Sequence, residues 1–443
     1  MTDIAQTPSV TGVTIRPRRL SPEDAAARTK RRYAAERRFR VVGLMGILIA
    51  LGLLVLLLTT IVAQGYTAFV QTTIKLDIAF DQAVIDPDGK LDPKALAGAN
   101  YASLINQALF EAFPNVEGRT NRRALRGLMS SGAAQELQQM VLADPSVIGT
   151  TQEVWLLAAD DVDQYFKGYI DRAVPEADRR VKDNEIGWID TLQSEDRIET
   201  QFNRWFFTNG DSREPELAGI WGAVVGSFYM MLVTLALSVP LGVCAAIYLE
   251  EFAPKDSRWV DLIEVNVNNL AAVPSIVFGL LGLAVFLQLF HLPRSAPLVG
   301  GLTLTLMTLP TIVVATRAAL RAVPPSIREG ASGVGASRIQ VVSHHVLPLA
   351  LPGILTGTII GMAQALGETA PLLMIGMVAF IVDVPQGPLD PATALPVQNI
   401  HWADRTERAF TERTAAAIMV LLGFLIVMNA IAVFLRQRFQ IKW

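Results

Sequence analysis

The fold of this chain is decided by the stretch Ser326-Ile-Arg328-Glu329-Gly330-Ala331-Ser-Gly-Val-Gly335, which continues to Leu347-Pro348. This stretch is polar and punctuated by glycine, and it lies between two long apolar runs, residues 298–316 and 349–380. Each run is long enough to cross a hydrocarbon layer of ~30 Å at ~1.5 Å per helical residue. We therefore expect a short connection between two membrane spans, either a specialised loop or an ordinary basic connector.

The composition extends this interpretation to the whole chain. Of its 443 residues 51% are apolar and only 18% are charged. Four further apolar runs occupy residues 41–63, 222–249, 270–290 and 415–435, so we predict six transmembrane helices. The first run is too long and too far from the N-terminus for a cleaved signal peptide.

The distribution of basic residues predicts the orientation of these spans. Residues 1–40 carry ten basic and four acidic side chains, so we expect a disordered basic tail on the cytoplasmic side of the membrane. Six spans return the C-terminus to that side, together with Arg328 and its basic neighbours in the polar stretch. The outer loop at residues 381–413 holds Arg405, Arg408 and Arg413, which counts mildly against the rule.

Residues 64–218 are long enough for a separate domain outside the membrane. The segment has 25 acidic and 15 basic residues, and the single cysteine, Cys244, lies within a span, so no disulfide is expected. Alternating and helical periodicities predict a small α+β domain with strands at 73–80 and 151–158 and helices at 101–113, 122–142, 161–170 and 195–207. Four arginines share one helical face, either as a solvated surface or as an anion-collecting patch: Arg119, Arg122, Arg123 and Arg126.

Several kinds of chemistry are excluded by inspection. The chain has no phosphate-binding loop ending in Lys-Ser/Thr and no His-Glu-x-x-His, and four histidines with one cysteine offer no zinc constellation. No nucleophile with a neighbouring base stands out, and nothing indicates a nucleic-acid partner. We expect no catalytic residue, no metal and no bound cofactor.

The fifth apolar run combines a smooth face with one charged residue. Gly353, Gly357 and Gly361 recur every four residues, which lets another helix approach closely. Glu368 lies inside the same run, where a carboxylate costs about 2.5–3.5 kcal/mol on insertion scales. We therefore expect it to face water or a partner such as Gln364, one turn earlier on the same helix face, and to serve either a pathway or a structural role.

The sequence motifs carry a family resemblance. The polar stretch at 324–348 resembles the docking loop of ABC importer permeases, with Gly330 in place of a usual Ala and His345 in place of an aliphatic residue. Residues 219–443 resemble the phosphate permeases of that superfamily in several separate motifs: Pro240-Leu-Gly242, Ala245-Ala-Ile-Tyr-Leu-Glu-Glu251, Val273-Pro-Ser-Ile-Val-Phe-Gly279, Leu351-Pro-Gly-Ile-Leu-Thr-Gly357, Gly367-Glu-Thr-Ala-Pro-Leu-Leu373 and Ala394-Leu-Pro-Val-Gln398.

The resemblance implies a type I importer permease fold and a set of partners: a second permease, an ATPase dimer that uses ATP and Mg, and an external phosphate-binding protein. It implies that the ATPase contacts Arg328, Glu329, Gly330, Ala331, Gly335, Leu347 and Pro348. We expect the substrate pathway to include Glu368, Thr369, Gln364, Asn269 and Ser275. The family often has Arg where Gln364 stands, so an anion contact expected there is missing.

Three functions other than phosphate import by an ABC permease were weighed against the sequence. An ion-coupled secondary transporter would use Glu368 as its proton site, but it would be expected to show repeated halves and further buried ionisable groups. A sensor would need a signalling domain on the inner side, and the inner loops are too short for one. The third alternative is an ABC importer of another small anion.

Overall fold

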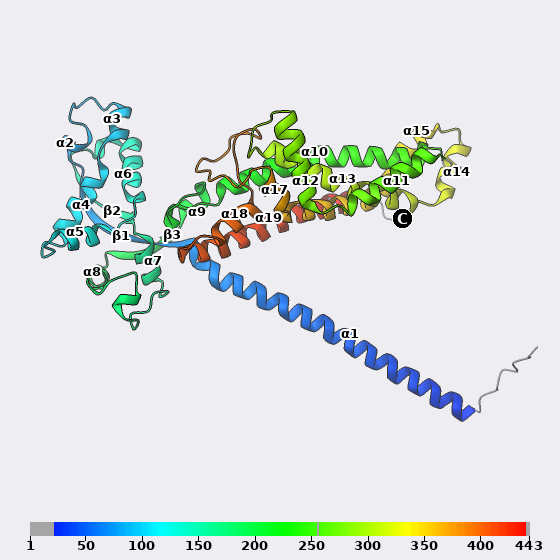
Figure 1. Ribbon diagram of the computed structural model, residues 1–443, viewed down its shortest axis with the longest axis horizontal. Coiled ribbons are helices and arrows are strands. Elements are labelled where there is room, and N and C mark those ends of the chain that lie inside the picture. The colour runs from blue at the N-terminus through cyan, green and yellow to red at the C-terminus, as the bar shows by residue number, and fades with distance from the viewer. Residues whose placement is uncertain (1–21, 255–256, 440–443) are drawn as a thin grey trace, which may run out of the picture. The chain divides into compact units, whose positions relative to one another are not determined.

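The computed structural model describes residues 22–254 and 257–439 (Figure 1). The chain divides into two compact units, residues 1–60 and 61–443. Within its described residues the first unit is a single helix, α1 (Pro22–Gly65), which continues into the second unit. Residues 22–40 are therefore helical rather than disordered, as their many Ala, Arg and Glu residues favour. The first 21 residues of the predicted tail lie outside the described part.

The predicted fold class, a helical membrane protein with a small α+β domain, is confirmed. Five helices of the described residues are long and apolar enough to cross a membrane, and a sixth span results if two helices bent by 102° count as one. These candidate spans are Ala26–Phe69, Trp221–Phe252, the bent pair Arg258–Ala271 with Ser275–Leu289, Pro297–Arg321, Arg338–Gly367 and Ala409–Arg438.

The α+β domain (residues 66–208) is built on a three-stranded antiparallel sheet in the order β2-β1-β3. The strands are β1 (Val70–Ala79), β2 (Thr151–Leu157) and β3 (Ile198–Phe202). Ile74 of the central strand pairs with Leu156 on one side and Ile198 on the other. From Ile74 to Ala79 the side chains of β1 alternate between buried and more exposed, as the period-two pattern predicted, whereas residues 71–74 are all buried.

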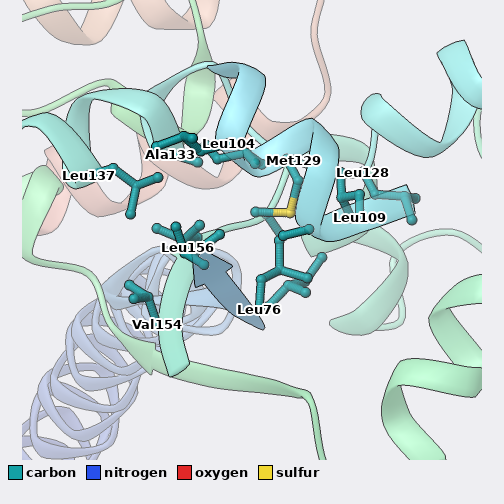
Figure 2. Packing of buried hydrophobic residues seen from close by; sticks show 14 of the residues in the cluster. Leu76, Leu104, Leu109, Leu128, Met129, Ala133, Leu137, Val154 and Leu156 are labelled. Carbon is teal, nitrogen blue, oxygen red and sulfur yellow. The ribbon is translucent and has the colours of Figure 1, made fainter. Parts of the chain in front are cut away.

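Eight helices accompany this sheet, and the apolar faces of α2 to α8 form one core with it (Figure 2). Leu76 and Leu156 from the sheet meet Leu104, Leu109 and Leu137 from the helices, and each of these five side chains is at most 3% exposed. The helices are α2 (Gln82–Ile85), α3 (Pro93–Gly98), α4 (Tyr101–Ala112), α5 (Arg119–Arg126), α6 (Gly132–Ala143), α7 (Asp160–Phe166), α8 (Asp183–Ser194) and α9 (Arg204–Thr208).

Two predicted helices of this domain are wrong, and in both cases backbone pairing with the sheet overrides helical periodicity. The expected helix at 122–142 breaks into α5 and α6 because Met129 forms an antiparallel bridge with Ala158. The expected helix at 195–207 is instead β3 followed by the short α9, since Ile198–Phe202 pairs with the free edge of β1.

The rest of the chain is a helical bundle (residues 221–439). Its helices are α10 (Trp221–Ile247), α11 (Arg258–Ala271), α12 (Ser275–Gly282), α13 (Pro297–Arg321), α14 (Pro325–Gly333), α15 (Arg338–Gln340), α16 (Leu347–Gly367), α17 (Ala370–Met374), α18 (Leu395–Ala403) and α19 (Ala409–Phe439). Wider π-helical turns extend α10 over Tyr248–Phe252 and α12 over Leu283–Leu289, and another, Val341–Val346, leads into α16.

The predicted smooth face of α16 packs against α13. A Cβ added at Gly353 would overlap the side chain of Ala319, and one added at Gly357 would overlap that of Ala315. Small residues therefore let the two backbones approach closely, which is how helices associate where lipid offers no hydrophobic driving force.

Two predicted spans are not single helices. The run at 349–380 ends as a helix at Gly367, where Glu368 adopts an extended conformation (φ −82°, ψ 126°), and only the five-residue α17 follows. The run at 270–290 is broken by Pro274, which disfavours helical geometry at the residue before it. The last helix starts at Ala409, earlier than the predicted 415.

The α+β domain is fastened to the bundle by apolar and charged contacts. Ala68 and Phe206 share one buried cluster with Trp402 and Phe410 of the bundle. Lys167 Nζ of α7 lies 2.8 Å from Asp163 Oδ2 and 2.9 Å from Glu412 Oε1 of α19, and these three side chains are 4–8% exposed. The domain is thus joined to the last helix by a buried ion network, not only by its chain connections.

Candidate coupling site and pathway residues

The connection between α13 and α16 is built around α14, which has one inward and one outward face. Ala331 is buried in an apolar cluster with Leu320, Val346 and Ile354, so it fixes α14 to the ends of the two long helices. This inward anchoring leaves Glu329 and Gly330 exposed on the other side.

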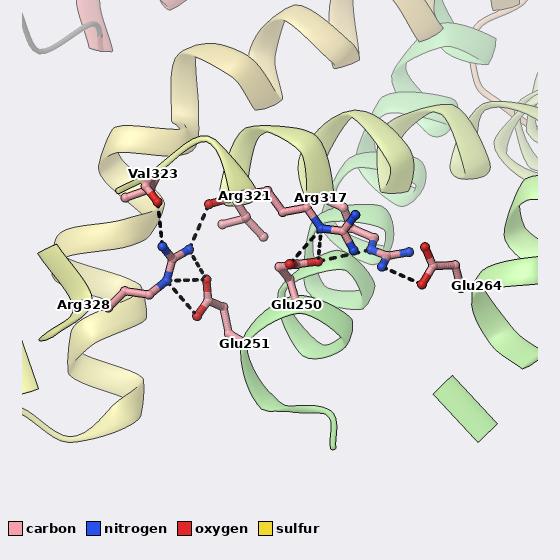
Figure 3. Close-up of polar contacts among 8 residues, drawn as sticks. Glu250, Glu251, Glu264, Arg317, Arg321, Val323 and Arg328 are labelled. Carbon is pink, nitrogen blue, oxygen red and sulfur yellow. Dashed lines mark hydrogen bonds and ion pairs between the residues drawn. The ribbon is translucent and has the colours of Figure 1, made fainter. Parts of the chain in front are cut away.

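Arg328 also faces the bundle. Its Nη2 lies 2.7 Å from Glu251 Oε1 in the wide turn after α10 (Figure 3). Nη1 donates to the Val323 carbonyl oxygen at 2.7 Å, and Nη2 donates to the Leu320 carbonyl oxygen at 2.9 Å. The resemblance placed Arg328 among the residues that contact an ATPase, whereas the structure uses its guanidinium to hold α14 against α10. Arg328 is therefore a positioning residue within this chain.

A second set of ion pairs lies beside it. Glu250 accepts from Arg321 at 2.9 Å and from Arg317 at 3.4 Å, and Arg317 reaches Glu264 of α11 at 2.9 Å (Figure 3). The side chain of Arg317 is only 10% exposed, so much of its charge is compensated by these partners rather than by water. The network links α10, α11 and α13, and Arg328 adds α14 to it.

The outward face of the connection ends in a tight, apolar tip. Gly335 has φ +89°, a left-handed conformation that side chains disfavour, and its N–H is bonded to the Ser332 carbonyl oxygen. Val334 and Ile339 on either side of it are 85% and 70% exposed. Sequence reasoning missed these two residues, although apolar side chains within a polar connector were the available signal. Leu347 and Pro348 are half-buried at the start of α16.

The predicted pathway residues are only partly brought together. Glu368 and Thr369 immediately precede α17, and α17 packs closely on α12, since a Cβ at Gly279 would overlap the backbone of Pro371. Ser275 begins α12, one turn before Gly279, and is half-buried. These three residues therefore lie in, or directly before, two elements that are in direct contact.

Gln364 and Asn269 stand apart from that contact. Both are exposed, and Asn269 lies on α11, before the 102° bend that leads to α12. Gln364 and Glu368 form no hydrogen bond among the described residues, because the helix that would have stacked them ends at Gly367. The half-buried Glu368 carboxylate has no partner within the described part of the chain, so water or another molecule must solvate it.

Two protein families match separate parts of the chain. Residues 238–441 match the family "Binding-protein-dependent transport system inner membrane component", and residues 26–176 match a "Domain of unknown function (DUF3333)". Most of the helical bundle is therefore similar to the first family, and most of α1 and of the α+β domain is similar to the second.

Two relatives that the chain resembles are permeases by name. The chain is 34% identical over 175 residues to the "Probable ABC transporter permease protein YqgI" of Bacillus subtilis, covering 39% of this chain and 58% of that protein. It is 33% identical over 177 residues to the "Phosphate transport system permease protein PstA" of Mycobacterium leprae, covering 40% and 57%. The chain thus spans less than two thirds of the curated relatives it matches. The predicted resemblance to phosphate permeases is confirmed.

A solved structure, of the MetNI methionine ABC transporter, aligns with 16% identity and a TM-score of 0.40 over 50% of this chain and 95% of that one.

Proposed function

We propose that this chain is a PstA-like permease subunit of an ATP-driven importer of inorganic phosphate. In this assembly it lines the translocation pathway with a PstC-like second permease. A PstB-like ATPase dimer consumes ATP and Mg, and a PstS-like external protein delivers phosphate. The chain itself binds no cofactor in this proposal. It lies in the bacterial inner membrane with both termini in the cytoplasm, as the basic residues of its N-terminal segment favour.

The observation that carries this proposal is the two-sided construction of α14. A helix that is anchored inward by Ala331 and Arg328, and presents Glu329, Gly330 and Val334 outward, is suited to transmit force from a partner. An ordinary connector would need neither the buried anchor nor the exposed apolar tip. The partner is the ATPase, and its groove receives Val334 and Ile339 together with Glu329.

The contacts of α14 give a route for that force. Displacement of α14 acts through the Arg328–Glu251 ion pair on the end of α10, and through Ala331 on α13 and α16. Because α16 packs on α13 by backbone approach at Gly353 and Gly357, those two helices move as one body. The break at Glu368 then passes the motion to α17 and to α12, which α17 contacts.

The test is reconstitution of the complete importer in proteoliposomes, with ATP hydrolysis and phosphate uptake measured together. We expect Val334→Asp to retain insertion and assembly of the two permeases but to lose ATP-driven uptake, because a charge replaces the apolar tip. The matched control is Ser332→Asp, which adds the same charge at an exposed position of α14 beside the tip. Unchanged uptake per ATP in the Val334 variant contradicts the proposal.

A second candidate substrate is another small anion. Gln364 stands where phosphate permeases often have Arg, which removes one positive charge from the expected pathway. Competition of labelled phosphate uptake by sulfate or arsenate separates the two: strong inhibition by sulfate favours a broader anion importer.

A further inference from the structure

The α+β domain carries a group of uncompensated arginines. Helix α5 reads Arg-Thr-Asn-Arg-Arg-Ala-Leu-Arg and contains four guanidinium groups and no acidic residue, although residues 64–218 have a net charge of −10. All four arginines are exposed, and none forms an ion pair in the described part of the chain. Most other arginines of the domain have a carboxylate partner, for example Arg172 with Asp190 at 3.0 Å and Arg197 with Asp77 at 2.9 Å.

Three of these arginines line one hollow. Its volume is about 410 Å³, and its walls are Phe110, Gly118, Arg119, Arg122 and Arg126. Positions 119, 122 and 126 fall on one face of a helix, since they are separated by three and four residues. Leu125, fully buried in the domain core, sets the rotation of α5 and so turns this face outward.

The guanidinium groups are partly oriented before any ligand binds. The Arg122 guanidinium lies over the Phe110 ring, 5.2 Å from its centroid, and its Nε donates to the Val116 carbonyl oxygen at 3.4 Å. Arg126 Nε donates to the Arg122 carbonyl oxygen at 3.3 Å. The terminal nitrogens of both side chains make no hydrogen bond with the described residues, so their paired donors are available.

We propose that this hollow binds a phosphoryl oxyanion, either free inorganic phosphate or the phosphate of an anionic lipid headgroup. Forked guanidinium donors match pairs of phosphate oxygens, and arginine is favoured where planar, bidentate recognition of phosphate is needed. The first turn of α5 carries no acidic residue to offset Arg119 at the positive end of the helix dipole, and a bound anion supplies that compensation. This site is separate from the transport pathway and does not depend on the proposed transport function.

The experiment compares two arginine-to-glutamine triple variants of the full-length chain in neutral detergent by titration calorimetry. The test variant is Arg119→Gln/Arg122→Gln/Arg126→Gln. The matched control is Arg172→Gln/Arg204→Gln/Arg213→Gln, which removes three exposed arginines of the same segment outside the hollow. The probes are inorganic phosphate, a water-soluble short-chain phosphatidylglycerol and, as a zwitterionic comparison, the matching phosphatidylcholine.

We expect the wild-type chain and the control variant to bind one of the two anionic probes alike, and the test variant to bind it about tenfold more weakly or worse. Loss confined to inorganic phosphate assigns the site to the free anion, and loss confined to phosphatidylglycerol assigns it to a headgroup. Hydrogen exchange over residues 110–126 should slow with the bound probe in the wild-type chain and the control variant, but not in the test variant. Equal binding by the two triple variants, or no binding of either anionic probe, overturns the proposal and leaves a solvated helix face.

Discussion

Arg328 and Glu251 lie 77 positions apart in the sequence and form a bidentate contact, with Nη2 at 2.7 Å and Nε at 3.2 Å from Glu251 Oε1. The pair fixes α14 to the end of α10, while the carbonyl oxygens of Val323 and Leu320 accept from Nη1 and Nη2 of the same guanidinium. Because of these contacts, α14 cannot tilt without disturbing α10.

This pair predicts a charge-reversal rescue. Arg328→Glu or Glu251→Arg alone places like charges together and should detach α14, at about 1–3 kcal/mol, because removal of one partner from a buried pair costs about 3–5 kcal/mol and Arg328 is partly exposed. Phosphate uptake per ATP should fall at least fivefold in each variant. The double exchange should recover most of it; a double variant as impaired as the singles would show that Arg328 does not act through Glu251.

Gly335 and Gly330 form a matched pair of substitutions. Gly335→Ala forces a side chain into φ +89° and should cost about 1–2 kcal/mol, distorting the tip. Gly330→Ala lies in helix α14 with nothing within 4 Å of the added Cβ, so it should be neutral or stabilising by about 0.5–1 kcal/mol. Thermal unfolding in detergent and coupled uptake should separate the two; equal behaviour would exclude a conformational role for Gly335.

Glu368→Gln should affect transport more than folding. The carboxylate has no partner in the described residues, so its neutral isostere removes no intramolecular contact and the melting temperature should stay within about 2 °C. Uptake should fall several-fold if the charge or its solvation serves the pathway. Normal uptake kinetics in the variant would leave Glu368 with a structural role.

The ion network between α7 and α19 predicts that replacing Lys167 lowers the stability of the chain strongly. Lys167→Met leaves Asp163 and Glu412 buried without their cation and should destabilise the chain by about 3–5 kcal/mol. Lys167→Met/Asp163→Asn/Glu412→Gln removes the unbalanced charges and should be clearly more stable than the single variant. The comparison is made by thermal unfolding, and equal stability of both variants would argue against a charge effect.

Asp160 predicts a dependence of stability on pH. Burial, followed by the nearby charges of Glu216, Asp161 and Asp163, raises the pKa of Asp160 to about 7. The folded chain therefore holds this proton more tightly than the unfolded chain, whose aspartate has a pKa near 3.8, so this contribution to stability declines as pH rises from about 4 to 7. Asp160→Asn should be more stable than wild type at pH 8 and should flatten the profile between these pH values; an unchanged profile would contradict the assignment.

The contact of Trp402 with the α+β domain bears on deletion experiments. Because the sequence predicts a separate domain at residues 64–218, the simplest expectation is that the five following spans stay inserted when those residues are removed. In the structure, that deletion strips Ala68 and Phe206 from the cluster around Trp402 and removes Asp211, which accepts the Trp402 Nε1–H at 2.8 Å. We now expect the deleted chain to be recovered from membranes in clearly lower yield, with Trp402→Ala in the full chain lowering thermal stability by about 3–5 kcal/mol.

Sequence patterns predicted what local periodicity determines. The alternation in β1, the amphipathic α4 and the small-residue face of α16 were all expected and all found, because each follows from residues within one segment. The break at Met129 and the conversion of residues 198–202 to a strand were not predictable in this way, since their cause is pairing with a strand elsewhere in the chain.

The candidate site, too, was only partly predictable from the sequence. Motif positions singled out residues of the 324–348 connection, but they could not indicate whether each side chain faces the bundle or the solvent. Arg328 faces inward because its partners lie in another helix, and Gln364 is separated from Glu368 because the helix ends between them. The sequence motif contains Glu368 and Pro371 together, yet only the structure shows that Pro371 rests on Gly279.

Because Lys167 and Glu412 form a buried ion pair, we expect the α+β domain to move together with α19. A spectroscopic label attached to an exposed position of that domain, such as Gln193, would report any tilting of the last helix without modifying the bundle itself. Distances measured from such labels across a turnover cycle would record the motion of the bundle from a position outside it.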